Sequence, residues 1–173
     1  MTEKNEKILE TALTLFEEEG CAATSSSRVA KEAGVSEGLI FRHFNNKGGL
    51  LKAILLNGSE KLGAMFRELQ HIRDSKEVLR RVIELPLAIE EDQKPFWKLL
   101  YALKWQADMH DEKMSAPMKE ILVPALKSLG YDNAEIEAEL IMVIMDGLAS
   151  HILLKKPGDP NAIKQAIFSK YRL

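Results

Sequence analysis

The sequence predicts an all-α protein of about nine helices, and two observations support that fold class. Apolar residues recur at three- and four-residue spacings over most of the 173 residues, and this spacing places them on one face of a helix. Glycine, proline and N-capping residues separate these stretches. No stretch shows the sustained alternation of apolar and polar residues that favours a strand. We therefore expect helices packed on helices.

Three helices are expected near the N-terminus. The first covers residues 4–19 and ends at Gly20, because glycine readily adopts the left-handed conformation that terminates a helix. Residues 25–27 are serines, which are preferred N-caps, and they begin a second, short helix. Gly34 turns the chain, and Ser36 is the expected N-cap of a third, also short, helix.

Longer helices are expected beyond this region. Asn46 is the expected N-cap of a long helix that starts near Lys47. Pro86 should kink the helix that follows, whereas Pro95 suits a first helical turn. Asp132 and Glu135 are spaced like a capping box. The predicted later helices cover residues 75–91, 95–109, 115–129, 132–156 and 161–171.

Composition limits the class of protein. Hydrophobic residues make up 46% of the chain, enough to form a core, and charged residues make up 29%. The single cysteine, Cys21, has no partner for an internal disulfide. The apolar run from Leu140 to Met145 ends at Asp146 and is too short to cross a membrane. Residues 1–7 are charged and carry no apolar signal segment. We expect a cytoplasmic protein with no membrane contact.

The net charge of −2 does not suggest a nucleic-acid partner, but the local charge differs. Between residues 28 and 47 the four basic side chains outnumber the two acidic ones, Glu32 and Glu37. A local basic face can bind phosphate even when the whole chain is acidic. The basic residues of this stretch are Arg28, Lys31, Arg42 and Lys47.

Residues 29–44 have the features of a helix-turn-helix. Two short helices that cross steeply need a small residue at their contact and a turn residue free to adopt positive φ. Ala30 and Gly34 meet these needs. Arg42, on the outer face of the second helix, can donate two hydrogen bonds to a guanine edge. Serine at a helix N-terminus, as at Ser25, can donate to a phosphate. The apolar residues expected to hold both helices are Val29, Ala33, Val35 and Ile40.

These residues, with the flanking helices, resemble the tetracycline-repressor (TetR) family of bacterial transcriptional regulators. The matching residues are Ile8-Leu9-x-x-Ala12-Leu13-x-Leu15-Phe16-x-x-x-Gly20, Thr24, Val29-Ala30-x-x-Ala33-Gly34-Val35-Ser36, Gly38-Leu39-Ile40-Phe41-x-His43-Phe44-x-x-Lys47 and Leu50-Leu51. The resemblance implies a helix-turn-helix DNA-binding domain over residues 1–50 and a helical regulatory and dimerisation domain over 51–173.

The resemblance also implies roles for single residues. Glu37, Gly38 and Arg42 would face base edges. The residues that would touch or flank the DNA backbone are Thr24, Arg28, Phe41, His43 and Lys47. Phe41 stands where the family usually has a tyrosine whose hydroxyl contacts phosphate. For His43, a structural, hydrogen-bonded histidine is the alternative to a DNA contact. For Cys21, a small core residue is favoured over a redox sensor. The predicted DNA-binding residues are Thr24, Ser25, Arg28, Glu37, Gly38, Phe41, Arg42, His43 and Lys47.

The sequence of the C-terminal part predicts a homodimer. The helix over 132–156 is apolar around most of its circumference, so it must be covered by its own core and by a partner. The resemblance implies that the last two helices pair across a two-fold axis. The predicted interface residues are Ile144, Leu148, Ile152, Ile163 and Ile167.

A ligand pocket is a further prediction. Trp97, Tyr101 and Trp105 recur at four-residue steps and form a second apolar stripe on their helix. Such stripes more often belong to a core, so a packed core remains the alternative. Kinked helices nearby pack imperfectly and leave room for a small apolar or aromatic effector. The predicted lining residues are Met65, Phe66, Trp97, Tyr101 and Trp105.

The sequence thus predicts a ligand-responsive repressor that binds double-stranded DNA as a homodimer. No phosphate loop, metalloprotease motif or nucleophile elbow occurs, so neither an enzyme nor a cofactor or metal site is expected. An activator, or an orphan factor without a small ligand, is one alternative. A helical bundle that binds a protein or cofactor is another, from a different class.

Overall fold

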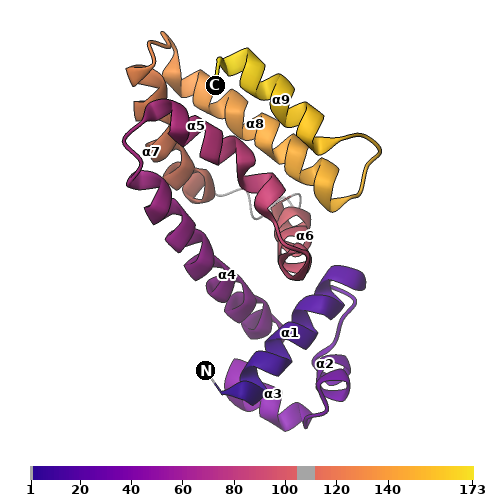
Figure 1. The fold of residues 1–173 in the computed structure, drawn as a ribbon. Coiled ribbons are helices and arrows are strands. Elements are labelled where there is room, and N and C mark those ends of the chain that lie inside the picture. Colours follow the sequence, from indigo (N-terminus) through magenta and orange to yellow (C-terminus); the bar gives the residue numbers. More distant parts are fainter. Residues whose placement is uncertain (1, 105–111) are drawn as a thin grey trace. The chain divides into compact units, whose positions relative to one another are not determined.

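The computed structural model of the protein describes residues 2–104 and 112–173 (Figure 1). Within these ranges every regular element is a helix and there is no strand. The all-α prediction is confirmed.

The chain forms two compact units. Unit 1 comprises residues 1–62 and 92–105, and unit 2 comprises residues 63–91 and 106–173. Helix α4 (Lys47–Gln70) begins in unit 1 and ends in unit 2. The predicted domain boundary at residue 50 remains a prediction. The segment 92–105, well beyond that boundary, belongs to the same unit as the N-terminal helices.

Unit 1 contains α1 (Glu3–Glu18), α2 (Ser26–Ala33), α3 (Glu37–Phe44), the first part of α4, and α6 (Lys94–Lys104). Helix α1 packs against both α2 and α6. Apolar side chains from all five helices are removed from water, which is the main source of stability of the unit. Its buried residues include Ile8, Phe16, Val29, Ile40, Leu50, Ile54, Leu99 and Leu103.

Unit 2 contains α5 (Ser75–Glu84), α7 (Glu112–Ser128), α8 (Ala134–Leu153) and α9 (Pro160–Tyr171). Helices α5 and α8 each pack against both α7 and α9. The Tyr171 hydroxyl, on α9, donates a hydrogen bond of 2.7 Å to the Glu137 carboxylate on α8. Its burial and the neighbouring carboxylate raise the pKa of Tyr171. The core of unit 2 includes Leu79, Ile83, Leu122, Leu126, Ile141 and Leu148.

The predicted end of the helix over 75–91 was wrong. The predicted helix over 75–91 ends at Glu84, and Pro86 lies in a 3₁₀ helix, η1 (Leu85–Ala88). Proline has no backbone N–H to donate to a carbonyl one turn earlier, and the regular α-helix ends two residues before it, at Glu84. A second short 3₁₀ helix, η2 (Glu91–Gln93), precedes α6.

Helix α8 also differs from its prediction. Its N-cap is Asn133, whose side chain accepts a hydrogen bond from the backbone of Ile136. The N-cap therefore lies one residue beyond the predicted Asp132, and no capping box forms, because Ile136 stands where that motif has Glu or Gln. The helix ends at Leu153, and Lys155 follows with a φ of 49°. The predicted end of the helix over 95–109 lies outside the described residues.

No helix within the described ranges has the length and apolar character required to cross a membrane.

Candidate nucleic-acid interface

The corner between α2 and α3 is a helix-turn-helix held by backbone hydrogen bonds. Gly34 has a φ of 69°, the left-handed conformation that glycine adopts without steric cost. The Val35 backbone N–H donates to the Ala30 carbonyl at 3.0 Å, a C-terminal cap of α2. Ala30 is 4% exposed, so a small residue fills the contact as predicted. Ser25 caps the other end of α2 by accepting from the Arg28 backbone N–H at 3.1 Å.

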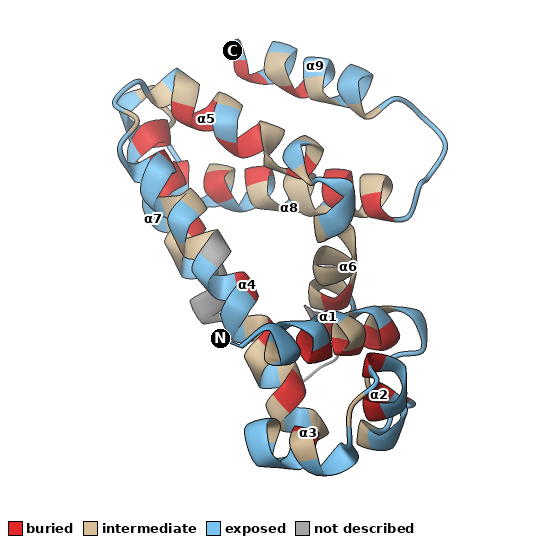
Figure 2. Ribbon diagram, turned by 60° about the horizontal axis from the view of Figure 1, so that its bottom comes forward, coloured by how far each residue is buried: buried red, intermediate tan, exposed pale blue. Residues whose placement is uncertain are grey.

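Helix α3 buries one face and exposes the other. Ile40 is 0% exposed and points into the core of unit 1. Most of α3 is pale blue in Figure 2, the colour of exposed residues. Phe41, an apolar residue, is nevertheless 52% exposed. The exposed residues of α3 are Glu37, Gly38, Phe41, Arg42 and His43.

Arg42 is available to an outside partner. Its side chain has no hydrogen bond or ion pair with any residue that the structure describes. The adjacent His43 has a tilted ring contact with Phe44, with centroids 6.3 Å apart, and its ring also remains exposed. Ser36 begins α3 as its N-cap residue, although its side chain makes no capping hydrogen bond.

The other two predicted cationic contacts are already engaged within unit 1. Arg28 pairs with Glu19 at 3.4 Å and with Glu32 at 3.1 Å. The Lys47 ammonium donates to the Ala22 carbonyl at 2.9 Å. Both side chains therefore tie α2 and α4 to the α1–α2 turn, and a phosphate would have to compete with these partners.

Thr24 has a structural position. Its side chain is buried, with 1% exposure, and its hydroxyl lies 3.0 Å from the Gly20 carbonyl oxygen and 3.3 Å from that of Leu15. The hydroxyl is therefore not free to contact DNA, and the expectation that Thr24 touches or flanks the DNA backbone stays a prediction. Thr24 instead fixes the turn that precedes α2.

The turn between α3 and α4 is unusually tight. Asn45 has a φ of 67°, and the Asn46 side chain accepts from the Gly49 backbone N–H at 2.9 Å. A Cβ added at Gly49 would lie 1.7 Å from the Phe44 carbonyl oxygen. Only glycine fits there, because the end of α3 and the start of α4 approach so closely. Asn46 was predicted as a cap, but no pattern in the sequence indicated why position 49 must be glycine.

Helix α6 is joined to α1 and α4 by two contacts within unit 1. The Lys98 ammonium lies 2.9 Å from the Glu17 carboxylate of α1. The Phe96 ring occupies the space beside Gly58 of α4, since a Cβ there would lie 2.0 Å from the ring. Sequence reasoning missed both contacts because the residues are far apart in the chain and form no motif.

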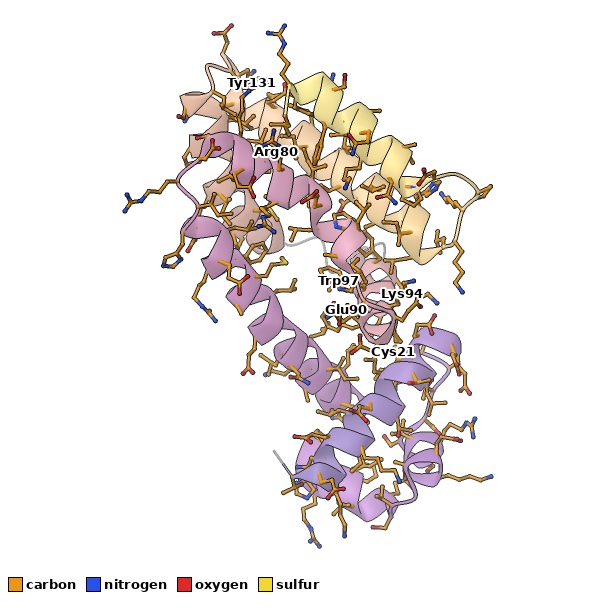
Figure 3. All side chains as sticks on the ribbon, viewed as in Figure 1. Cys21, Arg80, Glu90, Lys94, Trp97 and Tyr131 are labelled. Atoms are coloured by element: carbon orange, nitrogen blue, oxygen red, sulfur yellow. The ribbon has the colours of Figure 1, made fainter. Side chains whose placement is uncertain are left out.

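The predicted pocket residues belong to different units. Trp97 and Tyr101 lie on α6 in unit 1, and Trp97 is labelled in Figure 3. The Trp97 ring meets the Phe96 ring edge-on at 5.9 Å. Met65 and Phe66 lie on α4 in unit 2. Trp105 lies outside the described residues, so the pocket remains a prediction.

The predicted dimer residues divide by burial. Leu148 and Ile167 are 3% and 7% exposed and belong to the core of unit 2, so they are not available to a second chain. Ile144 and Ile152 are half-buried, and Ile163 is exposed. The most exposed apolar side chains of α8 lie elsewhere, on a stripe formed by Ile136, Leu140 and Val143, with Gly147 continuing it.

Among the residues that the structure describes, no three or more His, Cys, Asp or Glu side chains are grouped so that they could hold a metal ion. Cys21 is a half-buried free cysteine.

Comparisons with known proteins agree with this geometry. The sequence model of the bacterial regulatory proteins of the tetR family matches residues 8–54. The chain is 30% identical to the HTH-type transcriptional regulator YvkB of Bacillus subtilis over 88% of this chain and 85% of that protein. It is also 30% identical to the nucleoid occlusion factor SlmA of Vibrio campbellii over 99% of this chain and 88% of that protein.

Solved structures share the fold. A TetR-like transcriptional regulator from Rhodococcus sp. RHA1 superposes with a TM-score of 0.79 at 20% identity, covering 96% of this chain and 92% of that one. A transcriptional regulator from Saccharomonospora viridis, solved with choline, gives a TM-score of 0.75 at 24% identity, covering 98% and 95%.

The fold, the helix-turn-helix and these relatives define a DNA-binding transcriptional regulator, not an enzyme. The chain belongs to the TetR family of bacterial regulatory proteins.

Proposed function

We propose that this regulator is a ligand-responsive repressor that binds a palindromic operator as a homodimer. The observation that carries the proposal is the outer face of α3, where Arg42 is exposed and has no partner among the described residues. An unpaired guanidinium on a recognition helix can read a guanine edge by two hydrogen bonds. Bacterial DNA lies in the cytoplasm, so we expect the protein to act there.

The homodimer follows from the demands of DNA binding. One helix-turn-helix makes few contacts, and a two-fold dimer doubles them on a palindromic site. The exposed stripe of α8 is the surface we propose for pairing: Val143 is 66% exposed and Ile136 is 57% exposed. Gly147, exposed on the same stripe, would let a second helix approach closely. Ile163 of α9, at 37% exposure, adds apolar area.

We further propose an apolar or aromatic effector that acts through α6. Trp97 and Tyr101 offer aromatic surface on this helix. The Lys98–Glu17 ion pair joins the same helix to α1, and α1 packs on α2. A ligand that prefers a different position of α6 would lower DNA affinity by its preference between the two states. The choline-bound relative supports the idea that this fold accommodates a small molecule.

Selection of binding sites from random DNA tests DNA recognition. The intact protein should enrich one sequence, and Arg42→Ala should cost roughly 1–3 kcal/mol on that sequence while changing affinity for random DNA little. Lys31→Ala is the matched control, because Lys31 is an exposed cation on α2 instead of α3. Equal losses on both DNAs from Arg42→Ala would contradict the assignment.

Tryptophan quenching tests the effector. Candidate aromatic ligands should quench fluorescence and release DNA at the same concentrations. Quenching without release would leave a binding site with no coupling to DNA. Neither effect from any ligand would favour the orphan alternative, a factor that acts without a small molecule.

A further inference from the structure

Two features of α3 lack a structural purpose within the chain. The first is Gly38, in the first turn of an eight-residue helix. Its φ is not positive, and a Cβ added there would meet no atom within 4 Å. Glycine in a helix costs about 1 kcal/mol relative to alanine. Nothing in the fold requires that cost.

The second feature is Phe41, which is 52% exposed although it is apolar. Residues three and four apart in a helix share a face, so Gly38, Phe41 and Arg42 lie together on the exposed side of α3. Arg42 is the side chain proposed to read guanine. The surface around Gly38 therefore combines a bare backbone, an exposed ring and an unpaired cation.

We propose that Phe41 reads a thymine methyl group and that Gly38 lets the backbone of α3 approach the bases closely enough for this contact. The inference rests on the proposed DNA-binding function. A phenyl ring has no hydrogen-bond donor, so it gains nothing from a phosphate oxygen. The 5-methyl of thymine is the apolar group that the major groove offers, and apolar side chains recognise it. Each half-site should contain a thymine in a base pair next to the guanine read by Arg42.

The test uses the site selected from random DNA by the intact protein. Each thymine is replaced in turn by deoxyuridine, which lacks only the methyl group. At one position per half-site, the replacement should weaken binding about fourfold, and about fifteenfold when both half-sites are changed, from the loss of one buried methyl each. Replacement of the other thymines should change affinity little.

Variants of Phe41 assign the effect to this ring. Phe41→Ala should bind the thymine and deoxyuridine sites equally. Phe41→Tyr is the matched control: it keeps the ring and should keep the difference. Position 41 is exposed, so both variants should fold, and circular dichroism checks this.

Gly38→Ala provides a second, independent readout. The added methyl occupies open space in the free protein and favours the helix, so Tm should rise by about 2–4 °C. The same methyl should obstruct the approach to DNA and weaken specific binding. A purely structural role for Gly38 would instead leave DNA binding unchanged or improve it.

Three results would overturn the proposal. A selected site at which no deoxyuridine replacement matters would reject the methyl contact but leave the repressor function standing. A Phe41→Ala variant that keeps the thymine preference, or that changes self-association instead of DNA readout, would reject the role of this ring. A protein that selects no DNA sequence would overturn the proposed function and this inference together.

Discussion

Helices α3 and α8 both expose apolar side chains, but in different settings. On α3 one apolar ring, Phe41, lies among polar and charged neighbours such as Glu37 and Arg42. On α8 the exposed residues Ile136, Leu140 and Val143 follow one another along a single stripe. The first surface is mixed and the second is continuously apolar.

The difference indicates two kinds of partner. DNA presents charged phosphates, polar base edges and isolated methyl groups, and a mixed surface suits it. A continuous apolar stripe is costly in water, and it is best covered by a second surface of the same kind. The two surfaces therefore fit the two partners proposed for the chain, DNA at α3 and a second copy of the chain at α8.

Among changes in unit 1, the largest expected effect concerns how rigidly α3 is held. Gly49→Ala places a Cβ against the Phe44 carbonyl oxygen, and backbone must shift to relieve it. We expect a loss of about 2–4 kcal/mol in the free energy of unfolding, measured by urea denaturation.

Gly48→Ala is the matched control for Gly49→Ala. A Cβ there would lie 3.1 Å from Asn46 Oδ1, the end of a side chain instead of backbone, so its effect should stay within about 1 kcal/mol. Similar losses in the free energy of unfolding from both variants would show that the close approach of Gly49 to the Phe44 carbonyl does not constrain the α3–α4 turn.

A smaller effect is expected where α6 meets α4. Gly58→Ala would drive a methyl into the Phe96 ring, at a cost of about 1–3 kcal/mol. Because α6 also packs on α1, specific DNA binding should change as well. Adding Phe96→Ala should relieve the clash, so that the double variant is more stable than the sum of single losses implies. Strict additivity of the two changes would contradict the contact.

The smallest effect is expected from the Glu17–Lys98 ion pair. Its side chains are 20% and 36% exposed, so solvent weakens their attraction. A double-mutant cycle with Glu17→Gln and Lys98→Met should give a coupling of about 0.2–1 kcal/mol that falls as salt is added. A coupling that is zero at low salt would remove this pair from the link between α6 and α1.

Local signals made the fold of the N-terminal part predictable. Serine caps, a glycine turn and apolar spacing act over a few residues, so Ser25, Gly34 and Asn46 took their predicted places. Pro86 was misjudged because proline permits two outcomes, a bend or an end. The choice between them depends on packing that the local sequence does not encode.

The candidate site was only partly predictable for the same reason. The exposure of Arg42 follows from the helical period, whereas the Arg28–Glu19 ion pair and the burial of Thr24 depend on α1. Periodicity also failed to separate core from surface on α8, because the helix is apolar nearly all round. Leu148 was therefore predicted at the dimer interface although it lies in the core, while Val143 was not selected.

A comparison of two variants tests the exposed stripe of α8, the surface proposed for pairing. Val143→Glu changes a side chain that is 66% exposed, so the chain should fold but fail to pair. Leu148→Glu buries an unpaired charge at a position that is 3% exposed, so it should unfold unit 2. Circular dichroism and sedimentation distinguish the two outcomes.

The most direct test of the account is fluorescence anisotropy on the selected palindrome and on a duplex with one half-site scrambled. The wild-type protein should bind the intact palindrome about 10²-fold or more tightly than the scrambled duplex, because pairing makes the second contact intramolecular. Val143→Glu should be a monomer that binds both duplexes weakly and within roughly a factor of two of each other. A Val143→Glu protein that remains a dimer and keeps the wild-type preference would contradict the account.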